Sequence, residues 1–275
     1  MELGEFYKVA GSWALLQREL GWRAGAASGE PSDDEKRLGR GVGRLLHLDD
    51  TDRLSFLLQG LTDGQPPVVQ NLSETDRLAL QDALDRLWAC PAFLDELHEL
   101  FTLLLERTDH LAPPMDWEQP VPLALHARYS RAEICAAFGL ITDTQQTTGQ
   151  SGVLFDRATR CDVFFITLKK SERLLSPTTR YNDYAISPWE FHWESQSNTQ
   201  EASAPGQRYI HHRERGSRVL LFVREENRRG GVTLPFHCLG FADYVSHEGE
   251  RPMAIRWRLQ RAIPGALYPE LAVAA

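Results

Sequence analysis

The hydrophobic pattern changes its period along the chain, and this change constrains the fold more than any other feature. In the first 110 residues, apolar side chains recur at intervals of three and four, most clearly over residues 93–105. This is the period of amphipathic helices with one buried stripe. From Val153 onward, apolar and polar residues alternate as they do in strands. The chain is therefore predicted to be α+β, with a helical region followed by a β-rich region.

Capping-box patterns mark several helix starts. Residues 32–35 and 130–133 each place a serine three positions before a glutamate, so both side chains can satisfy backbone N–H groups at a helix N-terminus. Residues 73–76 form a weaker version of the pattern. The box at 130–133 predicts a short helix that ends at Gly139.

A proline-rich stretch separates the two regions. Residues 111–122 carry four prolines and are interpreted as a linker. We therefore predict an acidic helical bundle over residues 1–122, ending in this linker, and a second domain over residues 123–275. The bundle holds no cluster of residues that indicates chemistry, so we interpret it as a scaffold.

The second domain is predicted to be a small antiparallel barrel. The expected strands are 163–168, 181–187, 191–195, 218–225, 236–245 and 253–259. Short strands separated by glycine-containing breaks favour a closed or half-closed, mainly antiparallel β-barrel-like domain of the PUA/SRA-like or B3-like pseudobarrel type. Residues 187–190 combine a capping box with a proline at the first helical position, which predicts one helical turn between two strands.

The charge of the chain is divided unequally. Residues 1–125 hold 11 Lys and Arg against 22 Asp and Glu, whereas residues 126–275 hold 19 against 16. The overall net charge of −8 argues against nucleic-acid binding, but the positive second region permits it. No apolar run approaches the ~18 residues of a membrane span, and we expect no secretion signal. The four cysteines form no C-x-x-C pair, which favours reduced thiols, a cytoplasmic location and no zinc ribbon.

Motifs for common enzymes are missing from the sequence. It contains no G-x-x-x-x-G-K-[ST], G-x-G-x-x-G or G-x-S-x-G pattern. A metal-dependent nuclease of the common type needs an acid two residues before a lysine, but Thr167 and Leu168 occupy those positions before Lys169 and Lys170. We therefore predict no catalytic residues, no cofactor and no metal site. The adjacent histidines at 211–212 are interpreted as surface residues, because neighbours on a strand point to opposite faces.

Residues 178–196 combine five aromatic side chains with hydroxyl, amide, guanidinium and carboxylate groups. Such a set can hold a nucleic-acid base by stacking on its faces and hydrogen bonding to its edge. The alternative is a buried strand pair whose polar residues face solvent. We predict a base pocket formed by Tyr181, Asp183, Trp193, Ser195, Gln196 and Arg208. In this pocket Tyr181 and Trp193 stack on the base, and Asp183 and Gln196 pair with its edge.

The segment 207–229 contains seven arginines against three glutamates. Guanidinium groups bind phosphates in a bidentate manner, so this composition favours contacts with a nucleic-acid backbone. For the loop at 228–229, a solvated hairpin is an equal alternative. We predict phosphate contacts at Lys169, Arg180, Arg213, Arg215, Arg224 and Arg256.

Several phrases of the sequence match one protein family in order. They are HARYSRAEICAAFG, VLFDRATRCDVFFITLKKSE, TTRYNDYAISPWEFHWESQS, GQRYIHH, VLLFVRE and LGFADYVSHEGERPMAIRWRL. This succession resembles the uncharacterised domain at the C-terminal end of bacterial DEAD/DEAH-box helicases that often carry a phospholipase-D-type nuclease domain. The resemblance covers residues 126–265, and residues 45–50 and 107–117 resemble the helical region that precedes the domain. This chain lacks the motor and the nuclease domains. It is therefore either a fragment or a stand-alone version of the family.

The resemblance implies restriction or phage-defence machinery in which one module grips DNA for a motor or a nuclease. We therefore predict a DNA-binding module that reads a modified or flipped base in duplex DNA, with a helicase or nuclease as partner and no membrane association. One alternative is a metal-dependent nuclease or base-processing enzyme that uses Asp156, Asp162, His192 or Glu194. The other is a protein-interaction scaffold that docks onto a helicase through its acidic helices.

Overall fold

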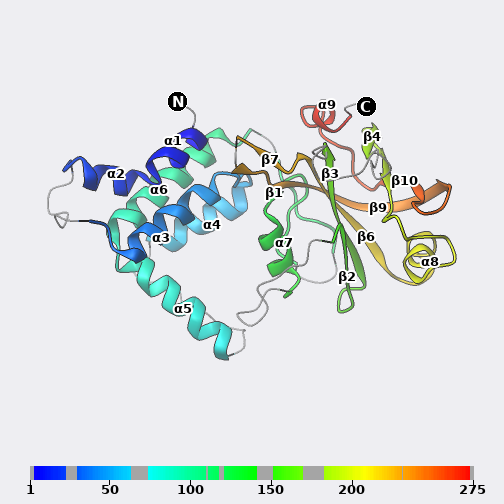
Figure 1. The fold of residues 1–275 in the computed structure, drawn as a ribbon, viewed down its shortest axis with the longest axis horizontal. Helices are drawn as coiled ribbons and strands as arrows, with labels where there is room; N and C mark the ends of the chain where they lie inside the picture. Colours follow the sequence, from blue (N-terminus) through cyan, green and yellow to red (C-terminus); the bar gives the residue numbers. More distant parts are fainter. Residues whose placement is uncertain are drawn as a thin grey trace. The chain divides into compact units, whose positions relative to one another are not determined.

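The computed structural model describes residues 3–22, 30–62, 74–109, 111–117, 121–140, 151–169, 183–230 and 232–272. These residues form two compact units, and the division lies between Leu111 and Ala112. Helices make up the first unit, and the second is built on a mainly antiparallel sheet (Figure 1). The predicted α+β class is therefore confirmed. No described helix is long and apolar enough to cross a membrane.

The first unit is helical. Its elements are α1 (Leu3–Ala10), α2 (Trp13–Glu19), α3 (Asp33–Val42), the 3-10 turn η1 (Gly43–Leu45), α4 (Thr51–Thr62), α5 (Glu74–Trp88) and α6 (Pro91–Arg107). The core of the unit contains the apolar stripe that α6 carries over residues 93–104. The capping box at the start of α3 is present, because Ser32 and Glu35 each accept the backbone N–H of the other. The weaker box at 73–76 lies outside the described side chains.

The described part of the second unit contains strands and three short helices. Its elements are β1 (Arg128–Tyr129), α7 (Arg131–Ala137), β2 (Val153–Asp156), β3 (Cys161–Lys169), β4 (Tyr184–Ser187), β5 (Glu190–Glu194), α8 (Ala204–Ile210), β6 (Arg218–Glu226), β7 (Arg228–Arg229), β8 (Val232–Thr233), β9 (Phe236–Glu248), β10 (Ala254–Leu259) and α9 (Tyr268–Leu271). The main sheet has the order β2-β3-β6-β9-β10-β5-β4, and β1 also pairs with β9. Only β3 and β6 are parallel among the described pairs. The path ends at β2 and β4, so the sheet is not closed.

The predicted strands correspond to β3, β4, β5, β6, β9 and β10, and their ends coincide or differ by up to three residues. The sequence pattern did not reveal β2 or α8. Gly206, one of the glycines between the predicted strands, lies inside α8, which separates β5 from β6. Ser203 accepts the N–H of Gly206 at 3.2 Å, and Pro205 lies in the first turn. Both features start a helix, and the helix is too short to show a period.

The predicted helical turn between β4 and β5 is wrong. Pro188 and Trp189 form a two-residue turn, and Ser187 pairs directly with Glu190. The expected capping contact is replaced by a local one, because Ser187 Oγ accepts the N–H of Trp189 at 3.2 Å. A serine before a proline favours a tight turn as well as a helix start, and pairing of the two strands selects the turn.

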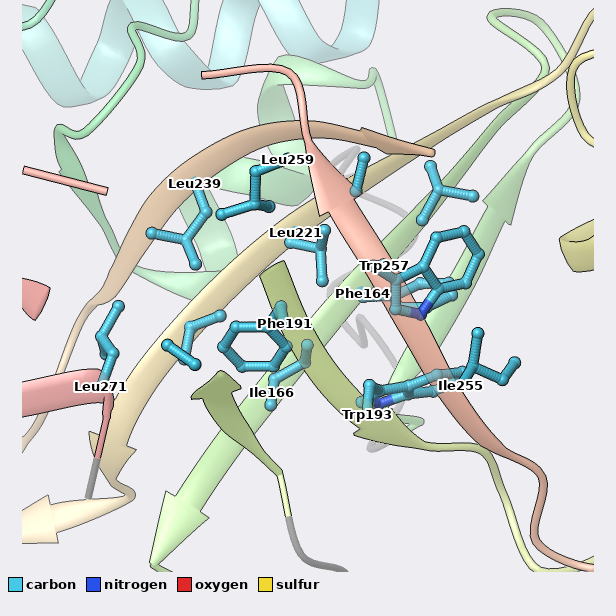
Figure 2. Packing of buried hydrophobic residues seen from close by; sticks show 14 of the residues in the cluster. Phe164, Ile166, Phe191, Trp193, Leu221, Leu239, Ile255, Trp257, Leu259 and Leu271 are labelled. Carbon is cyan, nitrogen blue, oxygen red and sulfur yellow. The ribbon is translucent and has the colours of Figure 1, made fainter. Parts of the chain in front are cut away.

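The sheet curls so that its inner face encloses one core (Figure 2). Phe164 of β3 lies with its ring centroid 4.2 Å from that of Trp193 of β5 and 5.6 Å from that of Trp257 of β10. β3 is adjacent to neither β5 nor β10 in the sheet, so these contacts cross the space that the curled sheet encloses. Tyr209 of α8 and Leu271 of α9 also belong to this core.

A second core lies on the outer face of β3, β6 and β9. It packs α7 and residues 123–129 against side chains such as Phe165 and Phe222. The proline-rich stretch contributes to it through Ala112, Met115, Trp117 and Val121. These apolar side chains give the stretch a surface to bury, so its described part packs on the sheet.

Candidate nucleic-acid interface

Three of the predicted base-pocket residues, Trp193, Ser195 and Asp183, are buried. Trp193 is 5% exposed, and its ring packs against Phe164 and Tyr209 in the inner core. Ser195 is fully buried, and its Oγ accepts the backbone N–H of Met253 at 2.8 Å. Stacking of a base on Trp193 would require this ring to leave the core. Trp193 attaches β5 to the inner core, and Ser195 attaches the end of β5 to Met253.

The next three predicted pocket residues are Asp183, Gln196 and Tyr181. Asp183 accepts the backbone N–H of Glu194 at 2.9 Å and is buried. Gln196 is exposed just after β5, and its Nε2 donates to Ser151 Oγ at 2.9 Å. This single neutral contact is easily exchanged for another polar partner. Tyr181 lies outside the described residues.

The sixth predicted pocket residue, Arg208, is bound to a buried acid. Its Nε and Nη2 donate to both oxygens of Asp162, at 2.6 and 2.7 Å. The Cζ atom also lies 4.1 Å from the ring centroid of Phe155. Burial raises the pKa of Asp162 above its usual value, and the hydrogen bonds from Arg208 oppose that shift. The pair therefore anchors α8 to β3 and leaves Arg208 little capacity for a base.

Two predicted phosphate contacts are ion-paired. Lys169 Nζ donates to Glu225 at 2.6 Å. Arg213 Nε donates to Asp243 at 2.8 Å, and Gln260 binds the same carboxylate. A phosphate would have to compete with these carboxylates, so both cations are weakened as phosphate ligands.

The other predicted phosphate contacts have no described carboxylate partner. Among the described residues, the guanidinium of Arg215 donates only to Gln207 Oε1, at 3.5 Å. Arg224 donates to neutral oxygens, and Arg256 is exposed with no hydrogen bond or ion pair to a described residue. Arg180 lies outside the described residues. Carboxylates from distant parts of the chain thus neutralise some of the predicted phosphate-binding cations and leave others without an acidic partner. The sequence alone cannot distinguish these two groups.

Arg256 belongs to a row of side chains that crosses four strands. Tyr184 of β4 pairs with His192 of β5, His192 with Arg256 of β10, and Arg256 with Ser246 of β9. Directly paired residues project from the same face of a sheet. The rings of Tyr184 and His192 are stacked, with centroids 4.9 Å apart and an interplanar angle of 18°. Because the next residue of β5, Trp193, is buried inside, this outer row lies on the opposite face.

The next row along β10 has a different charge balance. Arg258 lies two residues after Arg256 on the same face and is also exposed. However, its Nη2 donates to Glu190 at 2.8 Å, and it pairs in register with Asp243. The two arginines are both exposed on one face of β10 and differ in their acidic neighbours.

Arg224 is half-buried beside another cation. Its Cζ lies 4.1 Å from the ring centroid of Phe236, and its hydrogen bonds go to Thr167 Oγ1 and the Leu234 carbonyl, both at 3.0 Å. Burial and the nearby Arg131 lower the pKa of Arg224 to about 10. Arg131 was not among the predicted site residues. The signal was a cation in the first turn of a helix, where the helix dipole disfavours it.

Asp156 and Asp162, two of the acids considered for catalysis, have structural partners. Asp156 accepts the N–H of Thr159 at 2.8 Å in the turn after β2. The interpretation of His212 as a surface residue is wrong, because it is buried and its Nε2 accepts the N–H of Tyr244 at 3.1 Å. Burial lowers the pKa of His212. Within the described ranges, no group of three or more His, Cys, Asp and Glu side chains is arranged to hold a metal.

One comparison with known proteins identifies the second unit. Residues 123–271 match the model of a family described as "Domain of unknown function (DUF3427)". The matched range contains the outer row and both Arg131 and Arg224. No curated protein matches the chain.

Proposed function

Because the chain belongs to the DUF3427 family, whose description states no activity, we propose its function from its own residues: it is a DNA-binding module. We further propose that it serves a helicase-linked restriction or phage-defence system in the cytoplasm, with a helicase or nuclease as partner. In this role the β-rich unit grips DNA and reads a base that is modified, flipped or unpaired.

The observation that carries the proposal is the outer row of Tyr184, His192, Arg256 and Ser246. Proteins that bind single strands combine aromatic faces, on which bases stack, with cations that contact the backbone. Here a stacked aromatic pair lies beside an arginine that no described carboxylate neutralises. A base that stacks on the far side of Tyr184 extends the existing stack, and Arg256 can contact an adjacent phosphate.

The curl of the sheet supports the half-closed pseudobarrel within this proposal. Contacts from Phe164 to Trp193 and Trp257 hold the strands of the outer row rigidly from inside. A rigid support is what a base reader needs, because an extruded base is selected by shape and by hydrogen bonds to its edge. Gln196, exposed directly after β5, is the proposed reader of that edge. A PUA/SRA-like or B3-like identity remains part of the proposal.

The proposal is tested by the matched pair Arg256→Gln and Arg258→Gln. Both variants remove one exposed positive charge from the same face of β10. Arg256→Gln should weaken DNA binding and reduce the slope of log K against log salt by about 0.7–0.9, which corresponds to one phosphate contact. Arg258→Gln should leave the slope nearly unchanged, because Glu190 already neutralises Arg258. Fluorescence anisotropy with single-stranded and duplex oligonucleotides measures both quantities.

A second arm of the same experiment tests the aromatic part of the row. Tyr184→Ala should cost about 1–3 kcal/mol of binding to a single strand or an unpaired base. Tyr184→Phe should retain that affinity. Ile186→Ala is the control, since Ile186 is an exposed apolar residue two positions further along β4. Equal effects of the two arginine variants, or wild-type affinity in Tyr184→Ala, would remove the row from the interface.

A further inference from the structure

Two segments meet at the start of the parallel strands β3 and β6. Residues 157–160 form the turn between β2 and β3, and residues 213–216 lie in the loop between α8 and β6. The N–H of Arg218 donates to the Arg160 carbonyl at 3.0 Å. In the other direction, Nη2 of Arg160 donates to the Arg215 carbonyl. These bonds hold the two segments together, and we call their common surface the turn surface.

The turn surface carries exposed arginines that no described acid neutralises. Arg157, Arg160 and Arg215 are exposed, and none of them forms an ion pair with a described carboxylate. Glu214 is the one acid within the two segments, and it contacts a histidine of its own loop. Asp156, just before the turn, is buried and accepts backbone N–H groups of the turn. The surface therefore has an excess of positive charge.

Arg160 is held in a backbone conformation that favours glycine. Its φ is 53°, in the left-handed region, where a side chain is costly. Its guanidinium lies over Gly216, because a Cβ added to Gly216 would be 3.5 Å from Nη1. Among the described residues, Arg160 donates only to the Arg215 carbonyl, whereas a guanidinium carries five N–H groups. Most donors of this exposed and positioned group are therefore available to a ligand.

We propose that the turn surface binds the phosphate backbone of duplex DNA through Arg157, Arg160 and Arg215. The proposal rests on the DNA-binding function proposed above and adds a second contact, formed by residues other than the outer row. Duplex DNA carries one negative charge per ~1.7 Å of helix axis, so it presents several phosphates to a surface of this kind. The two segments contain no aromatic residue on which a base could stack, so the contact is to phosphates and independent of base sequence.

The first test uses a fully paired duplex oligonucleotide, which offers phosphates but no unpaired base. In the double variant Arg157→Gln/Arg215→Gln, binding should weaken. The slope of log K against log salt should fall by about 1.8, since each lost phosphate contact contributes about 0.9. Fluorescence anisotropy over a range of salt concentrations measures the slope. Both side chains are exposed, so the double variant should keep the wild-type fold, which circular dichroism checks.

Arg213→Gln is the matched control. Arg213 lies in the same loop as Arg215 and its side chain is 72% exposed, but its Nε donates to Asp243 at 2.8 Å. Its loss should leave the slope nearly unchanged, because Asp243 already neutralises this charge. A wild-type slope in the double variant, or an equal reduction per arginine in Arg213→Gln, would overturn the proposal.

Arg160→Gly separates a DNA contact from a purely structural role. Glycine adopts a φ of 53° without strain, so the variant should keep the thermal stability of the wild type. Its salt slope should nevertheless fall by about 0.9. If Arg160 serves only to hold the Arg215 carbonyl, the variant should lose stability and keep the wild-type slope. That result would exclude Arg160 from the interface and contradict the proposal.

Two further comparisons separate the turn surface from the outer row and from other ligands. If Arg256→Gln and Tyr184→Ala bind single strands like the wild type while the double variant loses duplex binding, the outer row is wrong and the turn surface is supported. If the wild type binds no DNA of either kind, both proposals fail. Poly-glutamate tests a protein ligand: if it binds in place of duplex DNA and the double variant loses it, the ligand is an acidic protein segment, and the DNA proposal is overturned.

Discussion

At the scale of the residue, the pair Asp162–Arg208 shows how a buried acid makes an arginine unavailable for a ligand. Asp162 is fully buried at the start of β3, whereas Arg208 of α8 is partly exposed. Because Asp162 cannot reach water, it depends on Arg208 for solvation. Burial raises the pKa of Asp162, which means that the folded state binds its proton more tightly than the unfolded state does.

This linkage predicts a pH-dependent defect in Arg208→Leu. Without the guanidinium, the pKa of Asp162 rises further, so stability falls as pH increases through the raised pKa. We expect a loss of about 3 kcal/mol near neutral pH and a smaller loss at acidic pH, because Asp162 takes up a proton as the pH falls. Urea unfolding at both pH values measures the difference. The control Asp162→Asn should cost less near neutrality, since Arg208 can reach water. A pH-independent loss would show that Arg208 stabilises the fold only through packing on Phe155.

At the scale of the element, α8 depends on a close approach between its own backbone at Gly206 and the backbone at Gln200. The sequence pattern does not reveal this approach. A Cβ on Gly206 would lie 2.1 Å from the Gln200 carbonyl oxygen, a distance that requires the backbone to move. Gly206 therefore lets α8 pack against the residues before it. This packing places Arg208 at Asp162 and Tyr209 in the inner core.

We accordingly expect Gly206→Ala to destabilise the second unit by about 1–3 kcal/mol, the usual cost of overpacking. Gly60→Ala is the control, because Gly60 lies inside α4 and a Cβ added there would have no described atom within 4 Å. That substitution should stabilise its helix by about 0.5–1 kcal/mol, through lower backbone entropy in the unfolded chain. Thermal or urea unfolding of both variants gives the comparison. Wild-type stability in Gly206→Ala would mean that α8 shifts without cost.

At the scale of the whole molecule, the proline-rich stretch belongs to the β-rich unit by its contacts. The N–H of Leu125 donates to the Pro113 carbonyl at 2.8 Å, and Arg218 donates to the Asp116 carbonyl. The ring centroid of Trp117 lies 5.0 Å from that of Phe241 of β9. These contacts shield the backbone of residues 112–117 from proteases, whereas a free linker would be open to cleavage.

Limited proteolysis should therefore leave a stable fragment that begins close to Ala112. N-terminal sequencing and mass spectrometry of the fragment locate the cut. In Trp117→Ala the stretch loses its contact with Phe241, and the start of the fragment should move toward Leu123. Primary cuts inside β3, β6 or β9, or uniform resistance of the whole chain, would contradict the existence of two independently stable units.

Local patterns account for what the sequence by itself determined. The change of period predicted the α+β class, the helix α6 and six strands, because side-chain spacing reports which face of an element is buried. The alternation in β10 placed Arg256 and Arg258 outside and Ile255 and Trp257 inside, as the structure has them. Capping boxes located the starts of α3 and α7, since both partners lie within four residues.

Only the tertiary structure decided which polar groups are available. Arg208 and Asp162 lie 46 residues apart, and Lys169 and Glu225 lie 56 apart, so no local pattern connects them. The row of Tyr184, His192 and Arg256 requires the strand order β4-β5-β10 and one register, which long-range packing selects. The burial of Trp193 likewise depends on the curl of the sheet around Phe164. Strand order and register arise from contacts between segments far apart in the chain, and these contacts leave no periodic trace in the sequence.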